Sequence, residues 1–358
     1  MSFEQLLPLL DYLTGLWNEN LTDRITDIGF YGGEPMLNMS LIRQVIDYLE
    51  ERNKNKVFTY SMTTNGLLLD KHMDYLAEKG FNLLISLDGD RDCQSFRLKQ
   101  DGTNSYEVVY RNTILLRNKY PDYFTEKVNF HAVIHKNNSV RRVLEYFTRE
   151  FGKVPSLAEI SSDGLRDEKR DLFSFMHQSI EESIHNDSYP EELHSALGFE
   201  NPMKEYIYQY LKAYSGNIYD TYNSLISGIP IPQTPTGTCN PFAKKLFVTV
   251  KGEIMQCEHI SRQYVYGNVS SKGVSLNLES ISRKFNSMLD SIQSRCQKCS
   301  IASSCIVCIF SLGDSASLSR CKEFRTKKQF LHYQSSCLEI IHNNPELYSI
   351  LVKETYTG

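Results

Sequence analysis

The cysteines of this chain are concentrated in its last third. Of nine cysteines in 358 residues, one precedes residue 239 and eight lie between 239 and 337. Two cysteines separated by two residues turn both sulfurs toward one centre, an arrangement that suits iron–sulfur clusters and also zinc. Seven of the eight follow a regular spacing: Cys239-x12-Gly252-x4-Cys257, then Cys296-x2-Cys299-x5-Cys305-x2-Cys308, then twelve residues and Cys321.

The number of sulfur ligands limits what this array can hold. Two complete [4Fe–4S] clusters take eight thiolates, so seven leave one iron open or held by another group. Zinc is the alternative, although structural zinc pairs are usually separated by a longer loop than the five residues after Cys299. Disulfides are disfavoured because a reducing cytosol is the expected compartment. Cys93 and Cys337 fit no spacing and are expected to be ordinary thiols.

Polar or glycine-bearing segments follow three expected strands in the first half. Gly-Gly-Glu-Pro begins at residue 32, Thr-Thr-Asn-Gly at 63 and Ser-Leu-Asp-Gly at 86. Paired glycines let a ligand approach the backbone, and a glutamate can accept hydrogen bonds from an ammonium group. Each segment alone could be a simple turn. The candidate binding residues are Gly32, Gly33, Glu34, Pro35, Thr64, Asn65, Ser86 and Asp88.

Strands and helices alternate through residues 3–160, which predicts βαβ units and a parallel sheet. The carboxyl ends of such strands meet at one edge, where ligands bind, so the three segments should converge there. His131 and His135 alternate along one strand and could face the same site. Expected strands are 25–31, 57–62, 81–87, 128–134 and 157–160; expected helices are 3–17, 41–49 capped by Ser40, 70–79, 106–119 and 140–151.

The rest of the chain is expected to be less regular. Helical spacing covers 172–184 and 206–214, and Pro230, Pro232 and Pro235 form a stiff linker. A hairpin joins 245–250 to 253–257, and a terminal helix follows the cysteine loops over 322–345.

Composition and charge exclude several other classes of protein. The net charge is −4, and no run of five basic residues indicates a nucleic-acid partner. No apolar run approaches the roughly 18 residues of a membrane span. The N-terminus has no basic segment before an apolar stretch, so a signal peptide is not expected. A cytoplasmic protein without nucleic-acid or membrane partners is therefore expected.

The cysteine array resembles the seven-cysteine SPASM motif of radical-SAM peptide-modifying enzymes. In that family the motif holds two auxiliary [4Fe–4S] clusters with interleaved ligands. The resemblance implies one set of Cys239, Cys257 and Cys308. It implies a second set of Cys296, Cys299, Cys305 and Cys321. The chain departs from the family where two residues, rather than the usual three, separate Cys305 from Cys308.

The first half is similar to the core of the same family. There, Gly-Gly-Glu-Pro binds the amino group of S-adenosylmethionine (SAM), and the later strand exits line its carboxylate and ribose. The implied fold is α/β: a partial (β/α)6 TIM-like radical-SAM barrel, its first strand apparently missing, plus a cysteine-rich SPASM domain. The expected parts are the barrel at 1–165, a helical connector at 166–238, the SPASM domain at 239–325 and a helical tail at 326–358.

One element of the family pattern is absent. Family members carry Cys-x3-Cys-x2-Cys for the third [4Fe–4S] cluster, which binds and cleaves SAM, and these 358 residues contain no such trio. Either the chain is N-terminally truncated or it is a degenerate homologue. The intact SAM-facing segments favour truncation. Without the trio the chain is expected not to cleave SAM, and binding of SAM with the third cluster is expected only if an upstream segment restores it.

The resemblance implies that the intact enzyme forms a 5′-deoxyadenosyl radical, which abstracts hydrogen from a peptide or protein substrate. An electron donor such as a flavodoxin or ferredoxin would be a second partner. Oxidation of Cys or Ser on a sulfatase is an alternative substrate chemistry. The non-enzymatic alternative is an iron–sulfur or zinc-binding partner protein of a peptide-maturation system. The sequence does not name the modified residue or the bond formed.

Overall fold

A computed structural model describes most of the chain, in two compact units: Leu10–Glu200, and Met1–Leu9 with Asn201–Gly358. The described residues are 1–19, 25–160, 165–190, 192–193, 207–208, 210–211, 238–242, 245–302, 305, 307–312, 321 and 324–357. The predicted helix at 206–214 and the three prolines of the predicted linker fall mainly or wholly outside these ranges.

The Leu10–Glu200 unit contains a five-stranded sheet, as the alternating pattern predicts. Its strands are joined in chain order and every pair is parallel. The mixed α/β class with a parallel half-barrel sheet is therefore confirmed. The strands are β1 (Thr26–Phe30), β2 (Phe58–Thr64), β3 (Asn82–Ser86), β4 (Val128–Ile134) and β5 (Ser156–Glu159).

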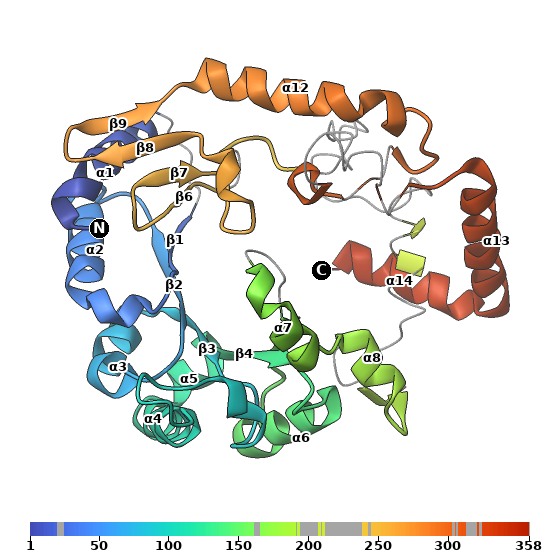
Figure 1. Cartoon of the computed structure of the whole chain (residues 1–358), viewed down its shortest axis with the longest axis horizontal. Helices are drawn as coiled ribbons and strands as arrows, with labels where there is room; N and C mark the ends of the chain where they lie inside the picture. The colour runs from blue at the N-terminus through green and yellow to red at the C-terminus, as the bar shows by residue number, and fades with distance from the viewer. Residues whose placement is uncertain are drawn as a thin grey trace. The chain divides into compact units, whose positions relative to one another are not determined.

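Helices connect the strands of this sheet, and Figure 1 shows α2, α3, α4 and α6 along the outer side of its curve. Helices α4 and α6 have the predicted bounds, whereas the short segments η2 and α5 were not predicted. The helical segments are α1 (Phe3–Glu19), η1 (Pro35–Asn38), α2 (Met39–Arg52), α3 (Leu69–Glu78), η2 (Cys93–Phe96), α4 (Tyr106–Lys119), α5 (Pro121–Lys127), α6 (Val140–Phe151), η3 (Asp167–Lys169), α7 (Arg170–Met176) and α8 (Ile180–His185).

The two faces of the sheet differ in polarity. Met62, Ile85 and Phe130 point to the helices and are at most 2% exposed, within one apolar core. Side chains alternate along each strand, so the opposite face carries the intervening residues. These are mostly polar: Asp27, Thr59, Ser61, Thr63, Asn82, Ser86, Asn129 and His131. The sheet therefore has an apolar face toward its helices and a polar face away from them.

Two predicted helices differ from the structure for local reasons. Helix α2 begins at Met39 because the Asn38 side chain, not Ser40, accepts the capping hydrogen bond from the Leu41 N–H. The helical pattern at 172–184 is broken into α7 and α8. His177 there forms a backbone bridge with His135, and Ser179 caps α8 by accepting from the Glu182 N–H.

The C-terminal unit contains a four-stranded antiparallel sheet in chain order. The predicted hairpin is its first pair, whereas β8 and β9 were not predicted. A Cβ at Gly252 would lie 2.3 Å from the Val269 carbonyl oxygen, and its φ is +85°, so only glycine suits this turn. The strands are β6 (Phe247–Val248), β7 (Glu253–Met255), β8 (Gly267–Ser270) and β9 (Gly273–Leu276).

The long helices described in this unit are α12 (Leu278–Cys296), α13 (Lys327–Asn343) and α14 (Pro345–Thr357). Figure 1 shows α12 following β9. Helix α12 was not predicted; it buries Ile281, Phe285 and Ile292 and ends on the first Cys-x2-Cys pair. The predicted terminal helix at 322–345 begins later because Thr326 and Gln329 form a capping box.

Candidate functional site

Glu34 is fixed at the carboxyl edge of the parallel sheet by three hydrogen bonds. Its Oε1 accepts from the Met36 N–H at 3.1 Å and from the Thr64 hydroxyl at 2.8 Å. Its Oε2 accepts from the Asn65 N–H at 2.7 Å. The exits of β1 and β2 therefore meet at one carboxylate, as expected for neighbouring parallel strands.

The backbone before Glu34 is open. Gly32 and Gly33 are exposed, and no heavy atom lies within 4 Å of a Cβ built on either of them. Gly32 has φ +145°, which disfavours any side chain. A carboxylate has about four acceptor positions, and the three bonds to Glu34 leave one for a ligand donor. This corner can therefore receive an ammonium group.

The turn after β2 is held from two sides. The Gly66 N–H donates to the Thr64 hydroxyl at 3.0 Å, and the Leu67 N–H donates to Oδ1 of Asn65 at 3.0 Å. On the other side, the Asn112 amide donates to the Gly66 carbonyl at 3.0 Å. Helix α4 thus holds the turn after β2, and this turn holds the Glu34 carboxylate.

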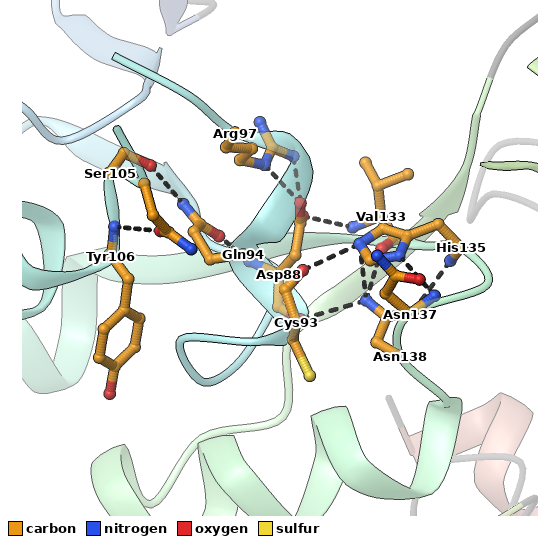
Figure 2. Close-up of polar contacts among 11 residues, drawn as sticks. Asp88, Cys93, Gln94, Arg97, Ser105, Tyr106, Val133, His135, Asn137 and Asn138 are labelled. Atoms are coloured by element: carbon orange, nitrogen blue, oxygen red, sulfur yellow. Dashed lines mark hydrogen bonds and ion pairs between the residues drawn. The ribbon is translucent and has the colours of Figure 1, made fainter. Parts of the chain in front are cut away.

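Asp88 lies at the exit of β3 and is 2% exposed. Figure 2 shows its carboxylate between Arg97 and the backbone of Val133. Arg97 donates from Nε to Oδ2 at 2.7 Å and from Nη2 to Oδ1 at 2.9 Å, and the Val133 N–H donates to Oδ1 at 2.8 Å. These contacts join the exits of β3 and β4, so in the structure Asp88 positions the site's framework.

Two amide side chains extend this framework. The Asp88 N–H donates to Oε1 of Gln94 at 2.7 Å, and the Gln94 amide donates to the Ser105 hydroxyl at 3.1 Å. The Asn138 amide donates to the Asp88 carbonyl at 3.3 Å (Figure 2). Sequence reasoning missed Arg97, Gln94 and Asn138. A buried aspartate requires a cationic partner, and that requirement is the signal that could have indicated Arg97.

Ser86 and His131 are register partners on the polar face of the sheet. Burial, with a smaller contribution from Arg97, lowers the pKa of His131. Its Nδ1 atom is buried without a hydrogen-bond partner in the described structure. His131 is therefore held as a neutral imidazole beside Ser86.

His135 has a different environment from His131. It follows the end of β4 and is 1% exposed. Its Nε2 lies 2.9 Å from the Cys93 carbonyl, and its Nδ1 accepts from the Asn137 N–H at 3.2 Å. These contacts assign the proton to Nε2 and make His135 part of the loop structure rather than of the polar face.

Cys296 lies within electrostatic range of three other cysteines of the array. Burial raises the pKa of the Cys296 thiol, and the neighbouring thiols of Cys305, Cys299 and Cys321 raise it further. The Cys299 N–H donates to the Cys296 carbonyl at 2.9 Å, which closes the turn between the first pair. The Arg325 N–H donates to Sγ of Cys299 at 3.4 Å. Such N–H···S contacts are typical around cluster ligands.

Of the remaining three cysteines, Cys257 lies within electrostatic range of Cys308. Burial raises the pKa of Cys257, and the charges of Glu258 and Cys308 add to this effect. The Gln256 amide donates to the Cys239 carbonyl at 2.5 Å, which holds Cys239 next to this strand. The assignment of the seven cysteines to sets of four and three stays a prediction.

Buried polar atoms without partners accompany the cysteines. In the described part of residues 201–358 these atoms are Gln256 Oε1, Glu258 Oε2, Tyr266 OH and Arg295 Nε. The first two flank Cys257, Tyr266 lies within electrostatic range of Cys308, and Arg295 precedes Cys296. A cluster at each centre would supply sulfur acceptors for the two donors. The residues present therefore fit iron–sulfur clusters.

A single ion is a different case. Among the described residues, no three His, Cys, Asp or Glu side chains are close enough together to hold one metal ion. A four-iron cluster is larger than one ion and needs its sulfurs further apart. Cys93 and Cys337 belong to neither centre: both are 0% exposed in apolar cores, and burial raises the pKa of Cys93 to about 12.

Residues 18–146 match the family model of the radical SAM superfamily. This segment therefore resembles radical SAM domains. It contains the Glu34 corner, the Thr64–Asn65 turn and the Asp88–Arg97 pair described above. The sequence match therefore agrees with the radical SAM resemblance that the motifs of the first half predict.

Two curated proteins resemble the radical SAM domain. A radical SAM cyclopropyl synthase, TigE of Paramaledivibacter caminithermalis, is 26% identical over 141 residues, which are 38% of this chain and 27% of that protein. An uncharacterised protein of Methanocaldococcus jannaschii is 28% identical over 144 residues, 36% of this chain and 48% of its own length. The chain thus matches about half or less of each relative's length.

Solved structures resemble the fold beyond the radical SAM domain. The anaerobic sulfatase-maturase anSMEcpe with bound AdoMet and the Kp18Cys peptide aligns with a TM-score of 0.53 and 16% identity, over 96% of this chain and 90% of the other. The same protein with the Cp18Cys peptide gives 0.55 and 15% over the same shares. At this identity the likeness shows the fold alone.

The radical SAM domain of this sequence lacks one set of ligands. A SAM-binding cluster needs three thiolates, and Cys93, the one cysteine before residue 239, is buried in the core. The residues present do not fit that cluster, so they support no step of SAM cleavage.

Among the described residues, no helix is both long and apolar enough to cross a membrane.

Proposed function

We propose that this chain comprises the SAM-binding core and the SPASM domain of a radical SAM peptide maturase. The observation that carries the proposal is the Glu34 carboxylate, which three hydrogen bonds fix beside the open backbone of Gly32 and Gly33. Oriented carboxylates bind ammonium groups well because the hydrogen bonds are charge-assisted. SAM carries such a group on its methionine part. The proposed parts are the core at 1–165, the connector at 166–238, the SPASM domain at 239–325 and the tail at 326–358.

The proposed SAM contacts come from the strand exits of the parallel sheet. Glu34 receives the ammonium group through its remaining acceptor position, and the Gly32–Gly33 backbone borders it. Ser86 and Asn65 lie at the two following strand exits and would face the remainder of SAM. Asp88 does not contact SAM in this proposal, because its carboxylate already accepts hydrogen bonds from Arg97 and from the Val133 N–H. It holds the exits of β3 and β4 together.

The polar face of the sheet supports a peptide as the substrate class. Asp27 accepts from the Thr59 hydroxyl at 2.9 Å and from the Ser61 hydroxyl at 2.7 Å, and Asn82 and Asn129 are exposed nearby in register. Such groups can pair with peptide N–H and C=O groups. The peptides bound in the two aligned structures agree with this class.

The auxiliary clusters form the second part of the proposal. The set of four cysteines around Cys296 and the set of three around Cys257 would each hold a [4Fe–4S] cluster, which supplies electron-transfer chemistry. The polypeptide contributes thiolates and donors such as Tyr266 and Arg295 that hydrogen-bond to the cluster sulfurs. Thiolate ligands require a reducing compartment, so we propose a cytoplasmic protein served by a flavodoxin or ferredoxin.

SAM binding to the Glu34 corner tests the first part. The few hydrogen bonds at this corner, each worth about 1 kcal/mol net, predict weak binding, measurable by ligand-observed NMR. Glu34→Gln should weaken binding about tenfold, since a charge-assisted bond is worth about 1.5–3 kcal/mol. Glu51→Gln, on the exposed side of α2, is the matched control. Equal SAM signals for both variants and the unmodified chain would refute the assignment of Glu34.

A non-catalytic iron–sulfur partner protein is the second candidate function. It is favoured by one observation: the 358 residues contain cysteines for the SPASM sets but no Cys-x3-Cys-x2-Cys. A partner protein would hold clusters and bind the precursor peptide without binding SAM. A zinc-binding protein of the same kind would contain zinc and no inorganic sulfide.

A further inference from the structure

Glu258 immediately follows Cys257, and its two carboxylate oxygens have different environments. Oε1 accepts from the Lys245 ammonium group at 2.6 Å. Oε2 is buried and has no hydrogen-bond partner in the described structure. The side chain is 18% exposed. Lys245 thus satisfies one oxygen of the carboxylate, whereas the other oxygen has lost water without a hydrogen-bond partner.

The position of this oxygen coincides with a shortage of sulfur ligands. Cys239, Cys257 and Cys308 supply three thiolates, whereas a four-iron cluster has four irons to ligate. Glu258 is the sequence neighbour of Cys257. Carboxylate oxygen is an ordinary protein ligand for iron. The unsatisfied oxygen thus adjoins the proposed cysteine set that is one thiolate short.

We propose that Oε2 of Glu258 ligates the iron that Cys239, Cys257 and Cys308 leave without a thiolate, while Lys245 holds Oε1. This inference rests on the proposed auxiliary clusters. Lys245 orients the carboxylate and offsets part of its charge. The centre is then fully ligated by protein, and the peptide substrate does not bind to its iron.

The neighbouring polar groups are suited to other roles. Tyr266 OH is a donor, and burial raises its pKa to about 12, so it stays protonated and can donate to a sulfur. The Gln256 amide already holds the Cys239 carbonyl. His259 is 83% exposed. Among these neighbouring residues, Glu258 is the one that offers an anionic oxygen without a hydrogen-bond partner.

Cyanide binding to the reduced clusters tests the proposal, since this small anion occupies an iron without a protein ligand. The experiment uses the full chain, reconstituted anaerobically and reduced with dithionite, with electron paramagnetic resonance as the readout. The unmodified chain should show no cyanide-dependent change. Glu258→Ala should show one and should retain its second cluster. Glu258→Cys should restore resistance to cyanide by supplying an eighth thiolate.

Two controls keep the outcomes distinct. Glu279→Ala removes a carboxylate that is 82% exposed on α12 and should behave as the unmodified chain does. If Glu258→Ala fails to fold, Glu258→Gln, which keeps the shape of the side chain and removes its charge, takes its place and should also show a cyanide-dependent change. An unmodified chain that holds two clusters and binds cyanide overturns the ligand assignment alone. A chain that holds no clusters overturns the proposed function as well.

Discussion

The Asn65 N–H donates to Oε2 of Glu34 at 2.7 Å, across 31 residues of sequence. The bond joins the exit of β2 to the exit of β1, and the Thr64 hydroxyl reinforces it from the same turn. Because both donors come from one turn, the orientation of the Glu34 carboxylate depends on the conformation of residues 64–67. The polypeptide thus positions the carboxylate before any ligand arrives.

Thr64→Val tests this dependence. Valine has nearly the same shape but removes the hydroxyl that donates to Glu34 and accepts from the Gly66 N–H. We expect SAM binding to weaken severalfold and unfolding free energy to fall by about 1–2 kcal/mol. Ligand-observed NMR and urea denaturation measure the two effects. Thr148→Val, at an exposed position of α6, should change neither. Unchanged SAM binding by Thr64→Val would show that the turn after β2 does not orient Glu34 for SAM.

Asp88→Asn tests the framework of the β3 and β4 exits. The change leaves Arg97 beside a neutral amide, and breaking a buried pair costs several kcal/mol. Arg97 is 28% exposed, which reduces the effect, so we expect about 2 kcal/mol. The urea midpoint, at constant slope, measures the loss. Glu51→Gln should stay within about 0.5 kcal/mol. A midpoint for Asp88→Asn equal to that of Glu51→Gln would show that the ion pair contributes nothing.

The stability of the domain should fall as the pH decreases below neutrality. Burial lowers the pKa of His135 in the folded protein, with opposing contributions from Asp88 and the Cys93 carbonyl. In the unfolded chain the imidazole has a pKa of about 6.5. Below that pH the unfolded chain binds a proton that the folded chain does not, so unfolding becomes easier until the folded pKa is reached.

His135→Gln should reduce this pH dependence without abolishing it, because burial also lowers the pKa of His131 and His72. Urea denaturation between pH 8 and pH 5 gives the comparison. His259→Gln replaces an exposed histidine and should retain the original dependence. A pH profile for His135→Gln that matches the unmodified chain would contradict the assigned neutral state.

This 358-residue chain should produce no 5′-deoxyadenosine from SAM and dithionite. Electron transfer to SAM needs an iron that binds it, and the sequence has no cysteine trio to hold that iron apart from the SPASM sets. Chromatography of the reaction mixture measures the product, with a competent radical SAM enzyme as the positive control. Formation of 5′-deoxyadenosine by this chain would require one of the SPASM centres to bind SAM.

Elements with strong local signals were predictable from sequence. The bounds of α4, β4 and α6 agree with the prediction because their apolar periodicity is regular and because Ser139 and Gly152 terminate α6 as a cap and a left-handed turn. The order of the strand exits, and so the convergence of Glu34 with Thr64 and Asn65, followed from the parallel topology.

Other features depend on contacts that the sequence does not display. His135 has the same parity as His131, yet β4 ends at Ile134 and the chain turns His135 into the core. The bidentate partner of Asp88 lies nine residues away, beyond a 3-10 segment with no periodic pattern. Helix α12 has only three buried apolar side chains among many serines and charged residues, so its pattern is weak.

Iron and sulfide analysis of the anaerobically reconstituted chain tests the central claim most directly. Two auxiliary clusters predict about eight irons, matching sulfide and a brown protein. Cys299→Ser and Cys257→Ser should each retain about four irons, because the proposal assigns the two cysteines to different clusters. A colourless protein with stoichiometric zinc, or loss of all iron from each single variant, would contradict the account.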